Sequence, residues 1–113
     1  MPLIRTSERR RFLDAGPFPQ ALQVGERQAV MLLCLQNGQE LVAPPGDLVE
    51  TTFAVLGGSG WVVEGDERHA VGEGDVVHVA PGVAKALVAG EATFTVLGVR
   101  ALAGGGRLEP RNR

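Results

Sequence analysis

The sequence of 113 residues contains no tyrosine, one cysteine and only five other aromatic side chains, four phenylalanines and one tryptophan. Without tyrosine, any mechanism that needs a phenol is excluded. With Cys34 alone, no intramolecular disulfide is possible, which fits a reducing compartment. Cys34 lies in an apolar run with no base close to it in the sequence. We therefore expect a buried, unreactive thiol.

Long hydrophobic runs are also missing. The first residues, Met1 to Arg5, contain no apolar stretch of the length of a secretory signal, and no segment approaches the roughly 20 apolar residues of a membrane span. These absences predict a cytoplasmic protein with no membrane partner.

Basic residues are scarce in the body of the chain, although the formal net charge is only -2. Between residues 13 and 100 the bases are Arg27, Arg68, Lys85 and Arg100, and acids exceed them. The Arg9-Arg10-Arg11 cluster near one end has no interleaved aromatic residues and matches no nucleic-acid-binding motif. We interpret the arginine-rich ends as solvated and expect no nucleic-acid partner.

Glycine and proline are abundant and spread through the chain, with 16 and 7 copies. This spacing favours many short strands joined by tight turns, and no helix-length amphipathic segment separates them. The apolar run over residues 28–36 reads as a buried strand, although its periodicity does not exclude a helix. Asn37-Gly38 is a strong turn signal. We predict strands over residues 28–36, 50–56, 61–63, 68–71, 76–79, 85–88 and 93–100, with Gly57-Gly58-Ser59-Gly60 and Gly90-Glu91 as interruptions.

These strands predict an all-β fold, an antiparallel sandwich or barrel. Residues 28–102 would form it. Residues 1–27 would be an N-terminal arm, either with one short helical turn within residues 6–14 or extended along a neighbouring subunit. Residues 103–113 begin with a glycine-rich stretch and would be a flexible tail.

Two stretches framed by glycines carry a family resemblance. The first has the spacing Gly38, Pro44, Gly46, Glu50, Gly57. It resembles the first motif of the cupins, which is Gly, five residues, His-any-His, three or four residues, Glu, six residues, Gly. The two outer glycines and Glu50 fall on that motif, whereas Pro44 and Gly46 stand at the histidine positions.

The second stretch begins at Gly74 and is similar to the second cupin motif, which is Gly, five residues, Pro-any-Gly, two residues, His. Gly82 falls on the later glycine, and Lys85 stands where the histidine would be. The proline is displaced by one position, to Pro81. Together the two stretches resemble a cupin over roughly residues 28–100.

The resemblance implies a small RmlC-like jelly-roll β-barrel, often a homodimer, with a pocket inside the barrel. In typical cupins three histidines and one glutamate from these positions bind a divalent metal. Here proline and glycine offer no ligating side chain, and a protonated lysine has no lone pair to donate. Glu50 alone cannot hold a transition metal. We therefore expect no metal at this position and no cofactor.

Glu50 and Lys85 then become the candidate polar anchors, because the resemblance implies that both point into one pocket. Lys85 is the sole lysine of the chain. Three roles stay open for it: reaching solvent at the barrel mouth, filling the metal position as an ion pair, or binding an anionic ligand or acting as an acid or base. Thr52 shares the strand face of Glu50 and could add a hydroxyl, or be an ordinary strand threonine.

The predicted ligand-binding residues are thus Glu50, Lys85, Thr52, Pro44 and Gly46. Three functions compete. The first is a metal-free cupin that binds a small, anionic molecule. The second is a metal-independent isomerase or lyase with Lys85 and Glu50 as acid and base, so the sequence leaves open whether the protein is an enzyme. The third is a dimeric structural or interaction module with a vestigial pocket.

Overall fold

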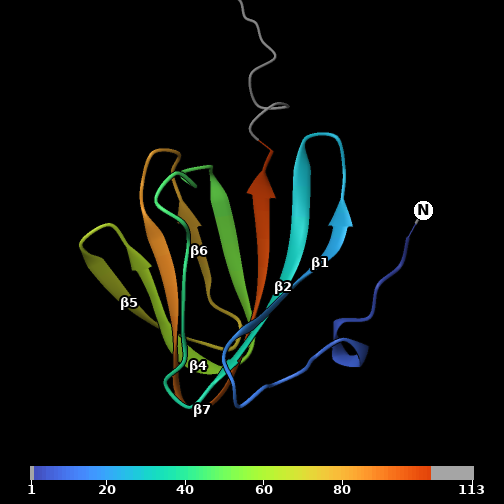
Figure 1. Cartoon of the computed structure of the whole chain (residues 1–113), viewed down its shortest axis with the longest axis vertical. Helices are drawn as coiled ribbons and strands as arrows, with labels where there is room; N and C mark the ends of the chain where they lie inside the picture. The colour runs from blue at the N-terminus through green and yellow to red at the C-terminus, as the bar shows by residue number, and fades with distance from the viewer. Residues whose placement is uncertain (1, 103–113) are drawn as a thin grey trace, which may run out of the picture.

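Seven antiparallel strands make up most of residues 2–102, the part of the chain that this computed structural model describes (Figure 1). A single 3-10 turn, η1 (Thr6–Glu8), precedes them. The strands are β1 (Phe18–Val24), β2 (Gln28–Gln36), β3 (Glu40–Val42), β4 (Thr51–Glu64), β5 (Glu67–Gly72), β6 (Val76–Val79) and β7 (Lys85–Ala101). The predicted all-β class and the short N-terminal turn are confirmed. The predicted tail, 103–113, lies outside the described residues.

Strands β4 and β7 are long and run through both halves of a folded sheet. The first part of β4 pairs with β6 and with the second part of β7, which in turn pairs with β2, and β2 pairs with the edge strand β1. The second part of β4 pairs with β5 and with the first part of β7, which carries β3. Figure 1 shows the strands curling around a common interior. The result is the predicted antiparallel jelly-roll β-barrel.

The bend in β4 lies at the glycine-rich stretch 57–60, where the pairing with β7 shifts register twice. Gly58 has a φ of 75°, and a Cβ there would lie 1.8 Å from the carbonyl oxygen of Thr93. Only glycine permits this close crossing. The prediction that this stretch ends a strand is wrong, because a bulge bends the ladder without ending it. The same holds for Gly90-Glu91, which lies within β7.

Two strands go beyond the sequence prediction. β1 lies in the predicted arm and pairs with β2 from Phe18 opposite Cys34 to Val24 opposite Ala29, so residues 18–24 belong to the sheet. The sequence did not predict this strand because Pro19 argues against a strand, although an edge strand tolerates proline. β3 has only three residues, too few for a pattern to show.

The core lies between the two halves of the barrel, where alternate residues of each strand point inward. Its buried members are Leu33, Leu35, Phe53, Val55, Val62, Val71, Val79, Leu87, Ala89, Phe94 and Val96. Cys34 is fully buried, as expected. Within residues 2–102 no helix has the length and apolar character that a membrane crossing requires.

Candidate ligand cavity

A cavity of about 250 Å³ opens into one end of the barrel, where β4 begins and where β7 both begins and ends. It is slightly smaller than the roughly 300–1,000 Å³ of typical ligand pockets. Apolar side chains and glycine supply most of its wall: Pro19, Met31, Leu33, Leu41, Val42, Ala43, Pro44, Phe53, Ala86, Leu87 and Gly98. Four polar residues complete it, namely Asp47, Thr51, Lys85 and Arg100.

Lys85 holds the loop between β3 and β4 in place. Its Nζ donates hydrogen bonds to the carbonyl oxygens of Asp47 at 3.0 Å and Val49 at 3.2 Å. The lysine side chain is only 5% exposed, and its nitrogen lies 3.7 Å from the Asp47 carboxylate. A buried ammonium needs such partners, because burying a charge without them is costly. The lysine is therefore chiefly a clamp on this loop.

Arg100, the penultimate residue of β7, lies at the same end of the cavity. Its Nη2 donates a hydrogen bond of 2.5 Å to Oδ1 of Asp47. Its side chain is 33% exposed, in contrast to that of Lys85. A guanidinium has five N–H donors. In the described part of the chain, the hydrogen bond to Asp47 uses one of them.

The polar end of the cavity has a surplus of positive charge. Lys85 and Arg100 bring two cations, whereas Asp47 brings the one carboxylate of the lining. Thr51 is neutral, and its hydroxyl donates to the carbonyl of Val49 at 3.0 Å. An anionic group placed here would meet an uncompensated cation in surroundings of reduced dielectric, where charge interactions are stronger than in water.

The structure brings together two of the predicted ligand-binding residues, Lys85 and Pro44, which both line the cavity. Gly46, Glu50 and Thr52 are not among the lining residues. Glu50 instead accepts a hydrogen bond at 2.6 Å from Nε2 of His78, and its side chain is 54% exposed. The Glu50–Lys85 ion pair, one of the three roles left open for Lys85, is therefore not formed, and within residues 2–102 the ion-pair partner of Lys85 is Asp47.

Glu50 and Thr52 lie outside the cavity because the inward face of β4 is offset by one residue from the face that the motif predicts. Side chains alternate along β4, and the inward face carries the buried Thr51, Phe53 and Val55. Thr52 and Glu50 fall on the opposite face. The large apolar side chains at 53 and 55 were the signal that could have assigned Thr51 to the interior. Asp47 and Arg100 escaped sequence reasoning because only the fold brings them together.

The positions that bind metal in typical cupins do not fit a metal in this chain. Lys85 is committed to two carbonyl oxygens, and Glu50 lies with His78. Pro44 and Gly46 have no ligating atoms in their side chains. The side chains at these four positions therefore do not make up a metal site.

The architecture, a single small antiparallel barrel with a cavity at one end, is a jelly-roll fold. Solved structures with the same fold identify it more closely. An RmlC-like cupin protein from Desulfovibrio desulfuricans is 25% identical, with a TM-score of 0.71 over 80% of this chain and 87% of that one. TT1209 from Thermus thermophilus has a TM-score of 0.81 at 18% identity, over 89% of this chain and 97% of that one.

A conserved protein with a double-stranded β-helix domain from Klebsiella pneumoniae is also similar, with a TM-score of 0.79 at 18% identity, over 89% of this chain and 90% of that one. No protein-family model and no curated protein sequence matches the chain. The similar structures confirm the resemblance to the cupins: this chain is a cupin-like protein with the RmlC-like jelly-roll fold.

Proposed function

We propose that this chain is a small-molecule-binding cupin whose cavity takes a compact, mainly apolar molecule with one negatively charged group. One observation carries the proposal: an apolar cavity ends in two cations and one carboxylate. Small-molecule sites usually combine apolar walls with a few placed polar groups. A carboxylate is the simplest negatively charged group that an otherwise apolar molecule could place beside these cations.

Arg100 is the anchor in this proposal, and Lys85 supports it by holding Asp47 and the loop in place. A planar guanidinium can bind a carboxylate through two parallel hydrogen bonds. Lys85 is nearly buried and already donates to two carbonyls. It would therefore attract an anionic ligand through its charge rather than through a direct hydrogen bond. Pro44 contributes apolar wall beside these groups.

The other two functions have less support from the geometry. An isomerase or lyase with Lys85 and Glu50 as acid and base needs both groups at one substrate, yet Glu50 is not in the cavity lining. A dimeric interaction module needs a homodimer, which remains a prediction. The cytoplasmic location also remains a prediction.

A matched set of three ligands tests the proposal. Benzoate, benzyl alcohol and benzylamine have similar shapes and differ in charge. Each is added to the full chain, and thermal unfolding and calorimetric titration are followed. A ligand that binds only the native state raises its stability. We expect benzoate to raise the melting temperature and the other two to have little effect.

The variant Arg100→Met should weaken benzoate binding about tenfold or more, because it removes a charged hydrogen-bond donor. Arg27→Met is the matched control, since Arg27 is exposed and outside the cavity lining. Equal stabilisation by all three ligands, preference for benzylamine, or benzoate binding that survives Arg100→Met would each contradict the proposal.

A further inference from the structure

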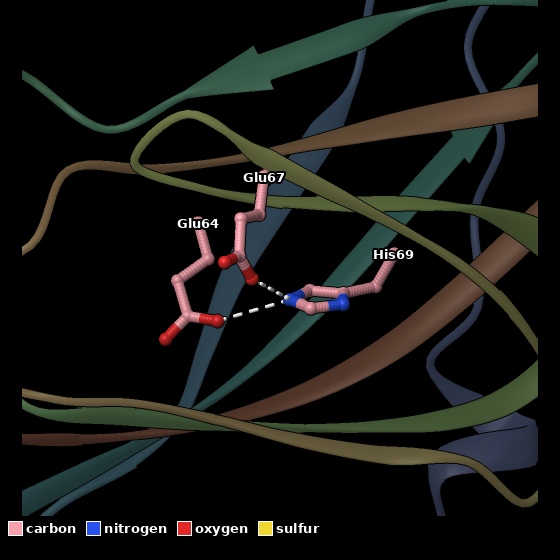
Figure 2. A group of neighbouring side chains, drawn as sticks. All are labelled: Glu64, Glu67 and His69. Carbon is pink, nitrogen blue, oxygen red and sulfur yellow. Dashed lines mark hydrogen bonds and ion pairs between the residues drawn. The ribbon is translucent and has the colours of Figure 1, made fainter.

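The hairpin of β4 and β5 brings three metal-ligating side chains together away from the cavity. Glu64, Glu67 and His69 each offer one ligand atom, and these atoms all lie within 4.8 Å of one another. Figure 2 shows both carboxylates turned toward one nitrogen of the imidazole ring. That nitrogen, Nε2, lies 3.0 Å from Oε1 of Glu64 and 3.7 Å from Oε1 of Glu67.

The register of the hairpin explains this convergence. A two-residue turn at Gly65 and Asp66 sets Glu64 directly opposite Glu67, and Val62 opposite His69. Residues that face each other across an antiparallel pair point to the same side of the sheet. Val62 is fully buried, so this side is the inner face of the barrel. The three side chains thus gather at the inner edge of the hairpin tip.

We infer that Glu64, Glu67 and His69 form a binding site for a divalent transition-metal ion. Bonds of about 2.0–2.2 Å from a metal to nitrogen and oxygen place neighbouring ligand atoms roughly 3.0–3.6 Å apart at angles between 90° and the tetrahedral value. The distances of 3.0 and 3.7 Å match this spacing closely. A metal would replace the Glu64–His69 hydrogen bond, and it needs only small rotations of Glu67, which is 75% exposed, and of Glu64, which is 27% exposed.

The charges at the hairpin tip favour a cation. Two carboxylates meet one imidazole, and Asp66 in the turn adds a further acid. Arg68 cannot compensate them, because it points to the other face of the hairpin and stacks over Trp61 at 5.1 Å from the ring centroid. Lys85, opposite Glu64 in the register with β7, directs its ammonium to the loop carbonyls.

The ligand types decide which cation fits. One imidazole with two carboxylates suits Zn²⁺ or another first-row divalent ion, whereas Ca²⁺ and Mg²⁺ prefer oxygen ligands alone. Three protein ligands leave a remaining coordination position to water, as in open zinc sites. The site uses none of the cupin motif positions at Pro44, Gly46, Glu50 and Lys85.

The test measures zinc binding to the full, tag-free chain after removal of bound metals. Calorimetric titration with Zn²⁺ should show one site per chain, with little competition from Mg²⁺. His69→Gln and Glu67→Gln should each weaken the affinity at least tenfold. The chain offers a matched control in its second histidine, His78, which pairs with one carboxylate, that of Glu50. His78→Gln should leave zinc binding unchanged.

Metal-free melting temperatures show whether each variant is folded, and the exposed position of Glu67, 75% accessible, makes Glu67→Gln the safest comparison. The inference is overturned if zinc fails to bind at concentrations up to about 1 mM. It is equally overturned if the affinity is the same in His69→Gln and Glu67→Gln as in the wild type, or if His78→Gln abolishes it.

Discussion

The cavity and the hairpin tip share strand β4, which continues into β5 at the tip and pairs with β7 at the cavity, but their charges have opposite signs. Lys85, at the start of β7, stands directly opposite Glu64, at the end of β4. From that row the lysine turns toward the cavity, where cations exceed the single carboxylate. The glutamate turns toward Glu67 and His69, where carboxylates are in excess.

The charged side chains of the two places differ in how far they are buried. The side chain of Lys85 is 5% exposed and is satisfied by carbonyls of the protein itself, so it stabilises the loop. Arg100, at 33%, and Glu67, at 75%, keep donors or lone pairs in reach of solvent. At the cavity the buried lysine holds the loop and the more exposed arginine faces the opening, whereas at the hairpin tip Glu64, Glu67 and His69 are all at least partly exposed.

The largest expected effect comes from Lys85→Met, which keeps the apolar stem and removes the ammonium. Two loop carbonyls lose their donor and Asp47 loses a neighbouring cation. Leaving buried polar groups without partners should cost about 3 kcal/mol of unfolding free energy. Urea unfolding with linear extrapolation measures it.

Arg100→Met is the comparison for that variant, because it removes the more exposed cation beside the same carboxylate. It should cost under about 1 kcal/mol, as partly exposed ion pairs usually contribute little. If the two variants lose the same free energy, burial does not distinguish the clamp from the anchor.

Sequence reasoning predicted the fold better than the site. The spacing from Gly38 to Gly57 and from Gly74 to Lys85 survives as loops and strand ends of a barrel, so it identified the architecture. Which face of β4 points inward changes with a shift of one residue. The motif placed Glu50 on the inward face, whereas Glu50 lies on the outer face beside His78. Asp47 and Arg100 are 53 residues apart, and pairs at such a distance carry no local pattern.

The hairpin tip shows the same limit from the other side. The sequence predicted strands over residues 61–63 and 68–71, which leaves residues 64–67 for a turn, and the pairing of β4 with β5 confirms this order. The convergence of Glu64, Glu67 and His69 depends on the turn having two residues, since one more would move His69 to the outer face. A hairpin pattern is therefore visible in the sequence, but its register and its side-chain cluster are not.

An intermediate effect is expected for Gly98→Ala, which narrows the cavity and leaves the hairpin tip untouched. A Cβ at Gly98 would lie 3.4 Å from Cδ1 of Leu33 and 3.5 Å from Cε1 of Phe53, in ordinary contact. The variant should gain about 0.5–1 kcal/mol in stability, since glycine is costly within a strand. Urea unfolding measures that gain.

Benzoate binding to Gly98→Ala should weaken by about three- to tenfold, because the added methyl group takes part of the cavity. Zinc affinity should not change, since separate sites respond independently. Calorimetric titrations with both ligands provide the check, and a loss of zinc binding would mean that the two sites are coupled through β4 and the strands paired with it.

The smallest expected effect is that of Arg68→Ala, on the outer face of the hairpin. Its guanidinium lies 5.1 Å from the centroid of Trp61, and such an exposed cation–π contact contributes about 0.5 kcal/mol. The loss is measurable by urea unfolding, and the emission of the single tryptophan reports the lost contact directly.

Arg68 also separates two explanations of zinc binding, because it is next to Glu67 in the sequence but on the other side of the sheet. If Glu64, Glu67 and His69 ligate the ion, Arg68→Ala should change the zinc affinity less than about twofold at physiological salt, where exposed charges are screened. A change as large as that of Glu67→Gln would mean that zinc responds to the summed charge of the hairpin rather than to three converging ligands.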